Sequence, residues 1–361
     1  MTQRPYNLYA GPAILPLEVI QQAQAELLDF AGTGLSILEI SHRSKEFDKT
    51  IKEAEADLRT LFGVSDDYYV LFLQGGASTQ FGMIPMNFLN GGVADVADYV
   101  DTGAWAKKAI QDGKRFGTVN ISASSSDKNY NYIPSSLKLT PNAKYVHITS
   151  NETIGGIQWQ KYPDTGSVPL VCDMSSDVMS RRVDISKFNL IYAGAQKNIG
   201  PSGVTLVIIK KSLVETCPDN IATMLNYKTH VKNPSLYNTP TTFGIYVIGL
   251  VMKWLLKRGG LKEIESTNFE KARILYELLD TSDYYIPIAE KDSRSIMNVT
   301  FKLKTPELDE KFVSESKKAG FLGLKGHRSV GGCRASIYNA FPLEGVMKLI
   351  EFMKKFEKEN S

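Results

Sequence analysis

The chain has 361 residues, of which 43% are hydrophobic and 22% are charged, and this composition is ordinary for a globular enzyme. Its formal net charge of +3, from 42 basic and 39 acidic residues, is too balanced to indicate a nucleic-acid or membrane-surface partner. The N-terminus lacks the apolar core of a signal peptide, and no apolar run has the length of a transmembrane helix. Three cysteines without metal-ligand spacing indicate neither a metal site nor a disulfide framework, so we expect a reducing, cytoplasmic setting.

Predicted strands and helices alternate along the first 255 residues. Helical apolar spacing covers residues 17–30, 47–62, 80–89, 105–114 and 243–257, and β-forming runs cover 68–73, 98–101, 144–149, 169–173, 188–193 and 204–210. This alternation predicts an α/β fold in which helices cover a mostly parallel sheet.

The order of the elements changes after Gly259 and Gly260, which form a typical helix-ending signal. An α+β pattern follows, with a helix over 261–279, a strand over 297–303, a helix over 307–319, a strand over 334–338 and a helix from 343. We therefore expect a large domain over 16–258 and a smaller C-terminal domain over 259–361. The N-terminal segment 1–15 is expected to pack against the smaller domain.

Lys197 comes just after the apolar run 188–193, which we expect to be a buried strand. The glycines and the proline of 200–203 exclude a regular helix there and let the backbone approach a ligand closely. Two interpretations remain open. Lys197 is either a lysine at a strand end that reaches solvent, or a partly neutral lysine that attacks a carbonyl to form an imine.

Two further polar features follow predicted strands, where open parallel sheets bind their ligands. Residues 75–78, Gly-Gly-Ala-Ser, stand between a strand and a helix and form either a tight turn or an anion site of backbone N–H groups. Asp173 closes the strand 169–173 and is either a cap for Ser175 and Ser176 or the partner of a buried cation.

A single cofactor would use all three features. Pyridoxal phosphate needs a lysine for its Schiff base, a carboxylate that keeps its ring nitrogen protonated, an anion site for its phosphate and an aromatic face against its ring. Trp105, shortly after the strand 98–101, is available for stacking, although a tryptophan taken alone favours ordinary core packing. The sequence therefore predicts a pyridoxal-phosphate site.

Two of the four histidines stand in His-Arg pairs, His42 with Arg43 and His327 with Arg328. Each pair is either a solvated surface turn or part of a cationic pocket for a doubly anionic phosphate. Arg334, after a Gly-Gly-Cys run, suits an α-carboxylate, because its guanidinium group matches a carboxylate with two parallel hydrogen bonds.

The segment 193–203, Ala-Gly-Ala-Gln-Lys-Asn-Ile-Gly-Pro-Ser-Gly, resembles the Schiff-base segment of the phosphoserine aminotransferase family, within the class V, fold-type I pyridoxal-phosphate enzymes. The resemblance covers essentially the whole chain and includes the segments 11–16, 39–47, 151–156, 237–243 and 324–340. It implies a mostly parallel seven-stranded sheet covered by helices in the large domain, and a smaller α+β C-terminal domain.

The resemblance implies roles at the cofactor by position. Lys197 would hold the cofactor as a Schiff base and shuttle a proton, Asp173 would pair with the ring nitrogen, and Trp105 would stack on the ring. Further contacts are implied for Thr153 at the phenolic oxygen, for Ala77, Ser78 and Gln196 at the phosphate, and for Asn238 and Thr239 at the phosphate of the partner subunit in a homodimer. Family members usually carry an arginine at the Ser78 position, so either the Ser78 hydroxyl or another cation replaces it.

The resemblance also implies the substrates. His42, Arg43, His327 and Arg328 would contact the substrate phosphate or the glutamate side-chain carboxylate, Arg43 and Arg328 coming from opposite subunits, and Arg334 would bind the α-carboxylate. The implied reaction is a ping-pong amino transfer from L-glutamate to 3-phosphohydroxypyruvate, which gives 2-oxoglutarate and O-phospho-L-serine in L-serine biosynthesis. A side activity on 4-phosphohydroxy-L-threonine stays open.

Two rival functions are compatible with a pyridoxal-phosphate site. A cysteine desulfurase needs an exposed reactive cysteine, for which Cys217 is the expected candidate, and usually has histidine at the position of Gln196. A non-catalytic cofactor carrier would have no use for the His-Arg pairs and Arg334. These residues favour the aminotransferase.

Overall fold

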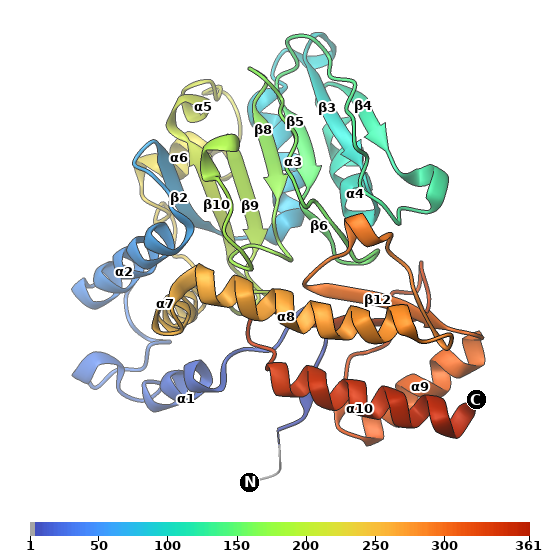
Figure 1. The fold of residues 1–361 in the computed structure, drawn as a ribbon. Coiled ribbons are helices and arrows are strands. Elements are labelled where there is room, and N and C mark those ends of the chain that lie inside the picture. Colours follow the sequence, from blue (N-terminus) through green and yellow to red (C-terminus); the bar gives the residue numbers. More distant parts are fainter. Residues whose placement is uncertain (1–3) are drawn as a thin grey trace.

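The structure is a computed structural model that describes residues 4–361 (Figure 1). Its centre is a seven-stranded sheet in the order β2 (Tyr68–Leu73), β10 (Thr205–Lys210), β9 (Leu190–Gly194), β8 (Leu170–Asp173), β5 (Val146–Thr149), β3 (Val96–Asp101) and β4 (Thr118–Ser124). Strand β10 is antiparallel to both of its neighbours, and the other neighbouring pairs are parallel. The prediction of a mostly parallel, seven-stranded sheet is confirmed.

Strand β10 reverses direction because no helix separates it from β9. The chain leaves β9 at Gly194 and enters β10 at Thr205, so the loop that carries Lys197 joins two antiparallel neighbours. Strand β4 was not predicted from the sequence. It lies at the sheet edge and its residues are mostly half-buried or exposed, so the run lacks the apolar character of the inner strands.

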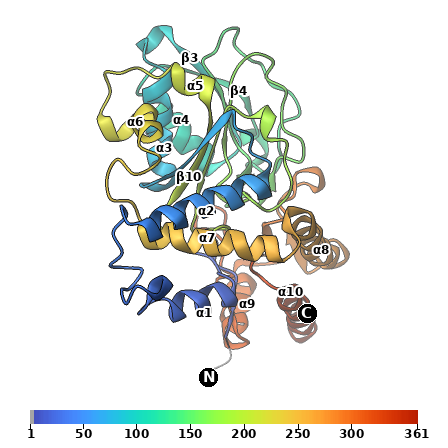
Figure 2. The ribbon, with the colours of Figure 1, turned by 90° about the vertical axis from the view of Figure 1, so that its left-hand side faces the viewer.

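Helices cover both faces of this sheet. One face packs on α2 (Lys45–Phe62) and α7 (Thr242–Lys257), and the other packs on α3 (Gly76–Phe88) and α4 (Ala104–Gly113). Figure 2 shows α2 and α7 running side by side, with α1 (Leu17–Ala25) beyond α7. The resulting three-layer arrangement leaves the strand ends free to carry polar groups.

A second hydrophobic core lies beside the central sheet. It joins the later part of α8 (Gly260–Thr281), α9 (Pro306–Lys318), α10 (Leu343–Asn360) and the antiparallel strands β11 (Tyr285–Pro287), β12 (Asn298–Leu303) and β14 (Cys333–Ser336). At the start of α8, Leu261 and Ile264 still pack in the first core. We propose that the two cores correspond to domains over 16–258 and 259–361.

The described part of the N-terminal segment packs on this second core. Strand β1 (Tyr6–Asn7) pairs in parallel with β13 (Phe321–Leu322), and Leu8 and Ile14 are buried among the core residues. The segment then crosses to the loop after β9, where the Ala13 N–H donates to the Gln196 carbonyl over 2.8 Å. We call residues 6–14 the N-terminal strap.

Two helix boundaries differ from the sequence-based expectation. The helix expected over 17–30 ends at Ala25, and a short 3-10 helix (Phe30–Gly32) follows, with positive φ at Ala31, Gly32 and Gly34. Helix α3 begins at Gly76 rather than at Gln80, because Gly75 and Gly76 (φ 92° and 68°) make the turn within two residues. The first turn of α3 therefore contains the Gly-Ala-Ser segment.

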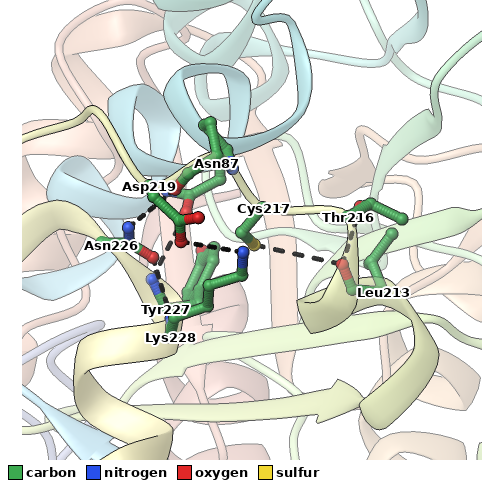
Figure 3. Close-up of polar contacts among 9 residues, drawn as sticks. Asn87, Leu213, Thr216, Cys217, Asp219, Asn226, Tyr227 and Lys228 are labelled. Carbon is green, nitrogen blue, oxygen red and sulfur yellow. Dashed lines mark hydrogen bonds and ion pairs between the residues drawn. The ribbon is translucent and has the colours of Figure 1, made fainter.

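The connection between β10 and α7 contains two short helices, α5 (Lys211–Glu215) and α6 (Tyr227–Lys232), that were not predicted. Figure 3 shows the side chains that fix this connection. Asn226 donates through Nδ2 to the Pro218 carbonyl over 2.8 Å, and Asn87 of α3 accepts from the Tyr227 N–H over 3.3 Å. These bonds anchor the chain on α3 shortly before it reaches Asn238.

The expectation that Cys217 is exposed is wrong. The side chain is buried against the core beneath α3, and its Sγ lies 4.0 Å from the Leu213 carbonyl oxygen (Figure 3). Burial raises the pKa of the Cys217 thiol to about 12, so the thiolate that a desulfurase needs is disfavoured. Within residues 4–361, no helix is long and apolar enough to cross a membrane.

Candidate active site

The candidate site lies at the carboxyl ends of four strands that point in the same direction. Lys197 follows β9, Asp173 ends β8, Trp105 follows β3, and Ala77 follows β2. Strand β2 runs in the same direction as β9 because both are antiparallel to β10. The fold therefore brings together residues that are up to 120 positions apart, at the edge where open sheets bind ligands.

Lys197 is a partly buried lysine with a lowered pKa. Its Nζ donates to Thr153 Oγ1 over 2.6 Å and lies 5.1 Å from the centre of the Trp105 ring. Burial lowers the pKa of Lys197 to about 8, while the carboxyl groups of Asp173 and Glu152 oppose this shift. A useful fraction of the amine is therefore neutral near neutral pH, as an imine-forming lysine requires.

Asp173 combines both of the roles considered for it. Its Oδ1 accepts hydrogen bonds from the Ser175 N–H (2.9 Å) and the Ser175 hydroxyl (2.6 Å), so it caps the turn after β8. Burial raises the pKa of Asp173, and Lys197 lowers it through its positive charge. A buried carboxylate near a cationic site is suited to hold a second cation, such as a protonated ring nitrogen.

Glu152, which the sequence did not single out, fixes the start of α4. Its carboxylate oxygens accept from the backbone N–H groups of Trp105 (3.3 Å) and Ala106 (2.9 Å). A side chain at Gly103 would place its Cβ 2.7 Å from the Glu152 carboxyl carbon, so only glycine permits this contact. Glu152 therefore positions Trp105 beside Lys197. In the sequence its partners lie about 47 residues away, and no local pattern joins them.

Glu152 gives a pH-dependence prediction for the cofactor-free protein. Burial raises the pKa of Glu152 from 4.5 to about 7, so the folded protein retains a proton that the unfolded chain has lost. Its contribution to stability is complete below pH 4.5 and is lost as the pH rises through about 7. The unfolding free energy of the wild type should fall between pH 5 and pH 7, whereas Glu152→Gln lacks this titration. We therefore expect the unfolding free energy of the variant minus that of the wild type to rise by up to about 3 kcal/mol over this range. Urea unfolding at several pH values measures this; a difference that does not change with pH would contradict it.

The first turn of α3 provides backbone donors for an anion. The first N–H groups of a helix have no acceptor within the helix, and here no side chain caps them. Ala77 and Ser78 lie in this turn, and a Cβ at Gly75 would come within 2.0 Å of Thr79 Oγ1. Asn238 lines a cavity of about 220 Å³ together with Gly75. This end of α3 can therefore bind a phosphate.

The loop of Asn238 and Thr239 is exposed beside this turn. Gln74 Nε2 donates to the Thr239 carbonyl over 3.1 Å, while both side chains of the loop are exposed. Gln196 is partly buried next to Lys197, and its carbonyl accepts from the N-terminal strap. The structure thus places the turn 75–78 and the loop 238–239 of one chain next to each other.

Two arginines and a histidine gather beside Lys197, on the side of the second core. Arg334 on β14 donates through Nη1 to the Thr153 carbonyl over 3.2 Å, and burial lowers its pKa. The pKa of His327 is lowered by burial and by the positive charges of Arg334 and Arg328. Among residues 4–361, no carboxylate forms an ion pair with Arg328 or Arg334. An uncompensated cluster of this kind suits an anionic substrate.

His42 and Arg43 are not joined to this cluster. They lie just before α2, whose N-cap Ser44 accepts from the Phe47 N–H over 3.2 Å. Arg43 is exposed, and His42 Nε2 is buried without a hydrogen-bond partner. Neither side chain is hydrogen-bonded to His327, Arg328 or Arg334 within the described residues.

The donor set fits pyridoxal phosphate part by part. The partly neutral amine of Lys197 suits the aldehyde, the buried Asp173 carboxylate suits a protonated ring nitrogen, and the uncapped end of α3 suits the phosphate. Trp105 presents an aromatic face beside the lysine, and its Nε1 is buried without a partner.

Comparison with known proteins identifies the family. The sequence pattern described as "Aminotransferase class-V" matches residues 5–349. Phosphoserine aminotransferase of Desulfosudis oleivorans is 56% identical over 362 residues and that of Bacillus subtilis 53% over 360, each match covering 99–100% of both chains. The solved phosphoserine aminotransferase of Bacillus circulans subsp. alkalophilus has a TM-score of 0.97 and 52% identity over 99% of both chains. That of Trichomonas vaginalis, described as bound to the cofactor PLP, has a TM-score of 0.92 and 40% identity over 97% of this chain and 100% of its own. The chain therefore belongs to the class-V aminotransferases, enzymes that depend on pyridoxal phosphate, and within them to the phosphoserine aminotransferases.

Proposed function

We propose that the protein transfers an amino group reversibly between L-glutamate and 3-phosphohydroxypyruvate, forming 2-oxoglutarate and O-phospho-L-serine for L-serine biosynthesis. The observation that carries this proposal is the uncompensated group His327, Arg328 and Arg334 beside a lysine of lowered pKa. Both substrates are amino or keto acids with a second anionic group, and such a cluster can bind either one. The full-length similarity to phosphoserine aminotransferases supports the same substrates.

Each residue of the site has a separate role in this reaction. When bound, pyridoxal phosphate withdraws electrons from the substrate Cα and makes its C–H bond acidic. The Asp173 carboxylate would keep a proton on the ring nitrogen, and the Trp105 ring would stack on the cofactor. Lys197 Nζ would accept the proton from the substrate Cα, hold it and return it during the amino transfer. Thr153 Oγ1 accepts a hydrogen bond from Lys197 Nζ in this structure. With the cofactor bound, it would contact the phenolic oxygen of the cofactor instead.

Substrate binding in this proposal depends on charge. The Arg334 guanidinium binds the α-carboxylate, which glutamate and phosphoserine share, and its bond to the Thr153 carbonyl orients it. His327 and Arg328, with His42 and Arg43, bind the phosphate or the glutamate side-chain carboxylate. For the cofactor phosphate we propose the N–H groups of Ala77 and Ser78, the Ser78 hydroxyl and Gln196.

Half-reactions test this function directly. Adding L-glutamate to the enzyme with its cofactor is expected to change the cofactor absorbance, and adding 3-phosphohydroxypyruvate is expected to restore it. Stopped-flow spectroscopy measures both steps. The absence of a response to either ligand would refute the proposal. The keto acid derived from 4-phosphohydroxy-L-threonine, assayed in parallel, measures the side activity that the resemblance leaves open.

We also propose that the enzyme is a homodimer with shared active sites. The support is a set of exposed apolar side chains, three in the sequence segment before His42 and one next to Asn238: Leu28 (84% exposed), Leu35 (49%), Leu38 (61%) and Tyr237 (47%). Exposed apolar side chains of this size favour association. In the dimer, Asn238, Thr239 and Arg43 of one subunit would complete the site of the other. The three buried, unpaired cysteines further support a cytoplasmic location.

Mixing two inactive variants tests the shared sites. Lys197→Ala removes the reactive amine, and Arg43→Ala removes a substrate contact from the partner's site. A random mixture forms hybrid dimers in which one of the two sites is intact, so we expect about one quarter of wild-type activity to return. Activity assays after joint refolding measure this. If Arg43 served its own subunit, every site would carry one defect and no activity would return.

A further inference from the structure

A row of polar side chains crosses the sheet face that packs on α3 and α4. In the strand register, Asp173 on β8 faces Tyr192 on β9, and His147 on β5 faces Val171 on β8. Side chains alternate along a strand, so Val171 and Asp173 point to the same face, and so do the residues opposite them. Apolar residues of the core beneath α3 surround this row. Two polar residues that the proposed reaction does not use, Tyr192 and His147, therefore extend from Asp173 across this face of the sheet.

The contacts within the row are specific. His147 Nε2 lies 2.9 Å from the Tyr192 hydroxyl. Tyr192 stands opposite Asp173 in the register of β8 and β9, and its hydroxyl lowers the pKa of the Asp173 carboxyl. The His147 ring stacks on Tyr99, with ring centres 5.0 Å apart and an interplanar angle of 26°, so its orientation is fixed. His147, Tyr192 and Asp173 are all at most 5% exposed.

The chemistry of these groups gives the chain of hydrogen bonds a direction. A hydroxyl carries one proton, so Tyr192 can donate to Asp173 only if it accepts from His147. Burial lowers the pKa of His147 to about 3, so its ring is neutral and carries a single N–H. Nδ1 is buried without a partner, and an unpartnered lone pair is tolerated better than an unpartnered N–H. The proton therefore belongs on Nε2, facing Tyr192.

We propose that Tyr192 and His147 are positioning residues that act on the cofactor through Asp173. His147 Nε2–H donates to the Tyr192 oxygen, and the Tyr192 hydroxyl donates to the Asp173 carboxylate, which it keeps ionised and aimed at the ring nitrogen. This inference rests on the proposed function, because it requires pyridoxal phosphate in the site. These hydrogen bonds strengthen the contact between the Asp173 carboxylate and the protonated ring nitrogen. That contact requires a nitrogen in the cofactor ring.

The test compares two cofactors on the protein freed of its own. One is pyridoxal phosphate, and the other is its deaza analogue, in which carbon replaces the ring nitrogen. Titration of the intrinsic fluorescence gives the affinity for each. We expect Tyr192→Phe to weaken pyridoxal phosphate about tenfold, because one hydrogen bond to a charged group is lost. Its affinity for the deaza analogue is expected to equal that of wild type.

The matched control removes a hydroxyl that lies on the same sheet face but is not part of the series His147, Tyr192 and Asp173. The Tyr145 hydroxyl lies 2.6 Å from that of Tyr99, and Tyr145 contacts neither Tyr192 nor Asp173 through a hydrogen bond. Tyr145→Phe is expected to leave the affinity for both cofactors and the kcat unchanged. In Tyr192→Phe, kcat is expected to fall about tenfold while the KM for glutamate stays constant.

The outcomes separate the two proposals. Equal weakening of both cofactors in Tyr192→Phe, or no weakening of either, overturns the positioning role and leaves the proposed function intact. A wild-type protein that binds neither cofactor overturns the proposed function itself. A second pair of variants addresses His147: His147→Gln keeps an N–H donor and should retain most of the affinity for pyridoxal phosphate, whereas His147→Leu should lose it as Tyr192→Phe does. Identical behaviour of the two His147 variants overturns the part assigned to His147.

Discussion

Replacing Lys197 by alanine is expected to lower turnover by about 10³-fold or more, because the change removes both the imine-forming amine and the group that moves the proton. The structure supports this dual role, since Lys197 Nζ is held by Thr153 beside the Trp105 ring and its pKa is lowered to about 8. Steady-state kinetics with glutamate and 3-phosphohydroxypyruvate measures the loss. Normal turnover in this variant would refute the assignment of Lys197.

A chemical measurement separates the loss of the amine from a loss of folding. Borohydride reduction of the wild-type protein with pyridoxal phosphate is expected to attach the cofactor covalently to the peptide that contains Lys197, as mass spectrometry can show. Lys197→Ala should show no such attachment at this peptide. Lys271 is a useful control, since its pKa is also lowered, to about 7, but its Nζ donates to the carbonyls of Ile337, Tyr338 and Phe341. We expect no attachment there.

The second large effect is expected for Asp173→Asn, a change that removes charge at nearly constant size. The asparagine oxygen can still accept from Ser175, so the turn after β8 should persist. A neutral amide cannot balance a protonated ring nitrogen, and breaking a buried charge pair lowers kcat here by about 10²- to 10³-fold. Single-turnover kinetics with glutamate measures this step.

Asp177→Asn is the matched control for the Asp173 variant. Asp177 is also a buried aspartate, and it accepts from Gln158 Nε2 over 2.9 Å and from the Ser150 hydroxyl. It makes no hydrogen bond with Lys197 or Trp105, and its charge affects the pKa of Lys197 less than that of Asp173 does. Its replacement should therefore lower the unfolding temperature and leave kcat within a few fold of wild type. Similar kcat losses in both variants would mean that any buried charge in this region has the same effect, and the specific role of Asp173 would be wrong.

Local patterns were enough to predict the framework. Apolar runs such as 68–73 and 204–210 predicted strands, and the alternation with helices predicted a mostly parallel sheet, which the structure confirms. The edge strand β4 was not predicted, because four of its seven residues are polar and the run is not continuously apolar. The antiparallel direction of β10 depends on the absence of a helix between residues 194 and 205. The glycines and the proline of 200–203 indicated that absence, but the direction of the strand was not predicted from it.

Site residues could be predicted only where the residue type and its position after a strand indicate a role without knowledge of its partners. Lys197, Asp173 and Trp105 stand after predicted strands and were proposed for that reason. Glu152, Tyr192 and His147 act through partners that are 19 to 47 residues away, and these partners meet only in the folded sheet. Cys217 shows the opposite error, since it was expected to be exposed and is buried in the core beneath α3.

The N-terminal strap has a consequence for how two different substrates use one site. It starts on the core that carries Arg334 and ends on the loop that carries Lys197, where a Cβ at Gly11 would lie 3.3 Å from the lysine Cγ. The strap therefore helps to fix the distance between Arg334, which binds the α-carboxylate, and the Lys197 amine, which reacts at the neighbouring carbon. Glutamate and phosphoserine are identical over that short span and differ beyond it, so one fixed separation serves both molecules.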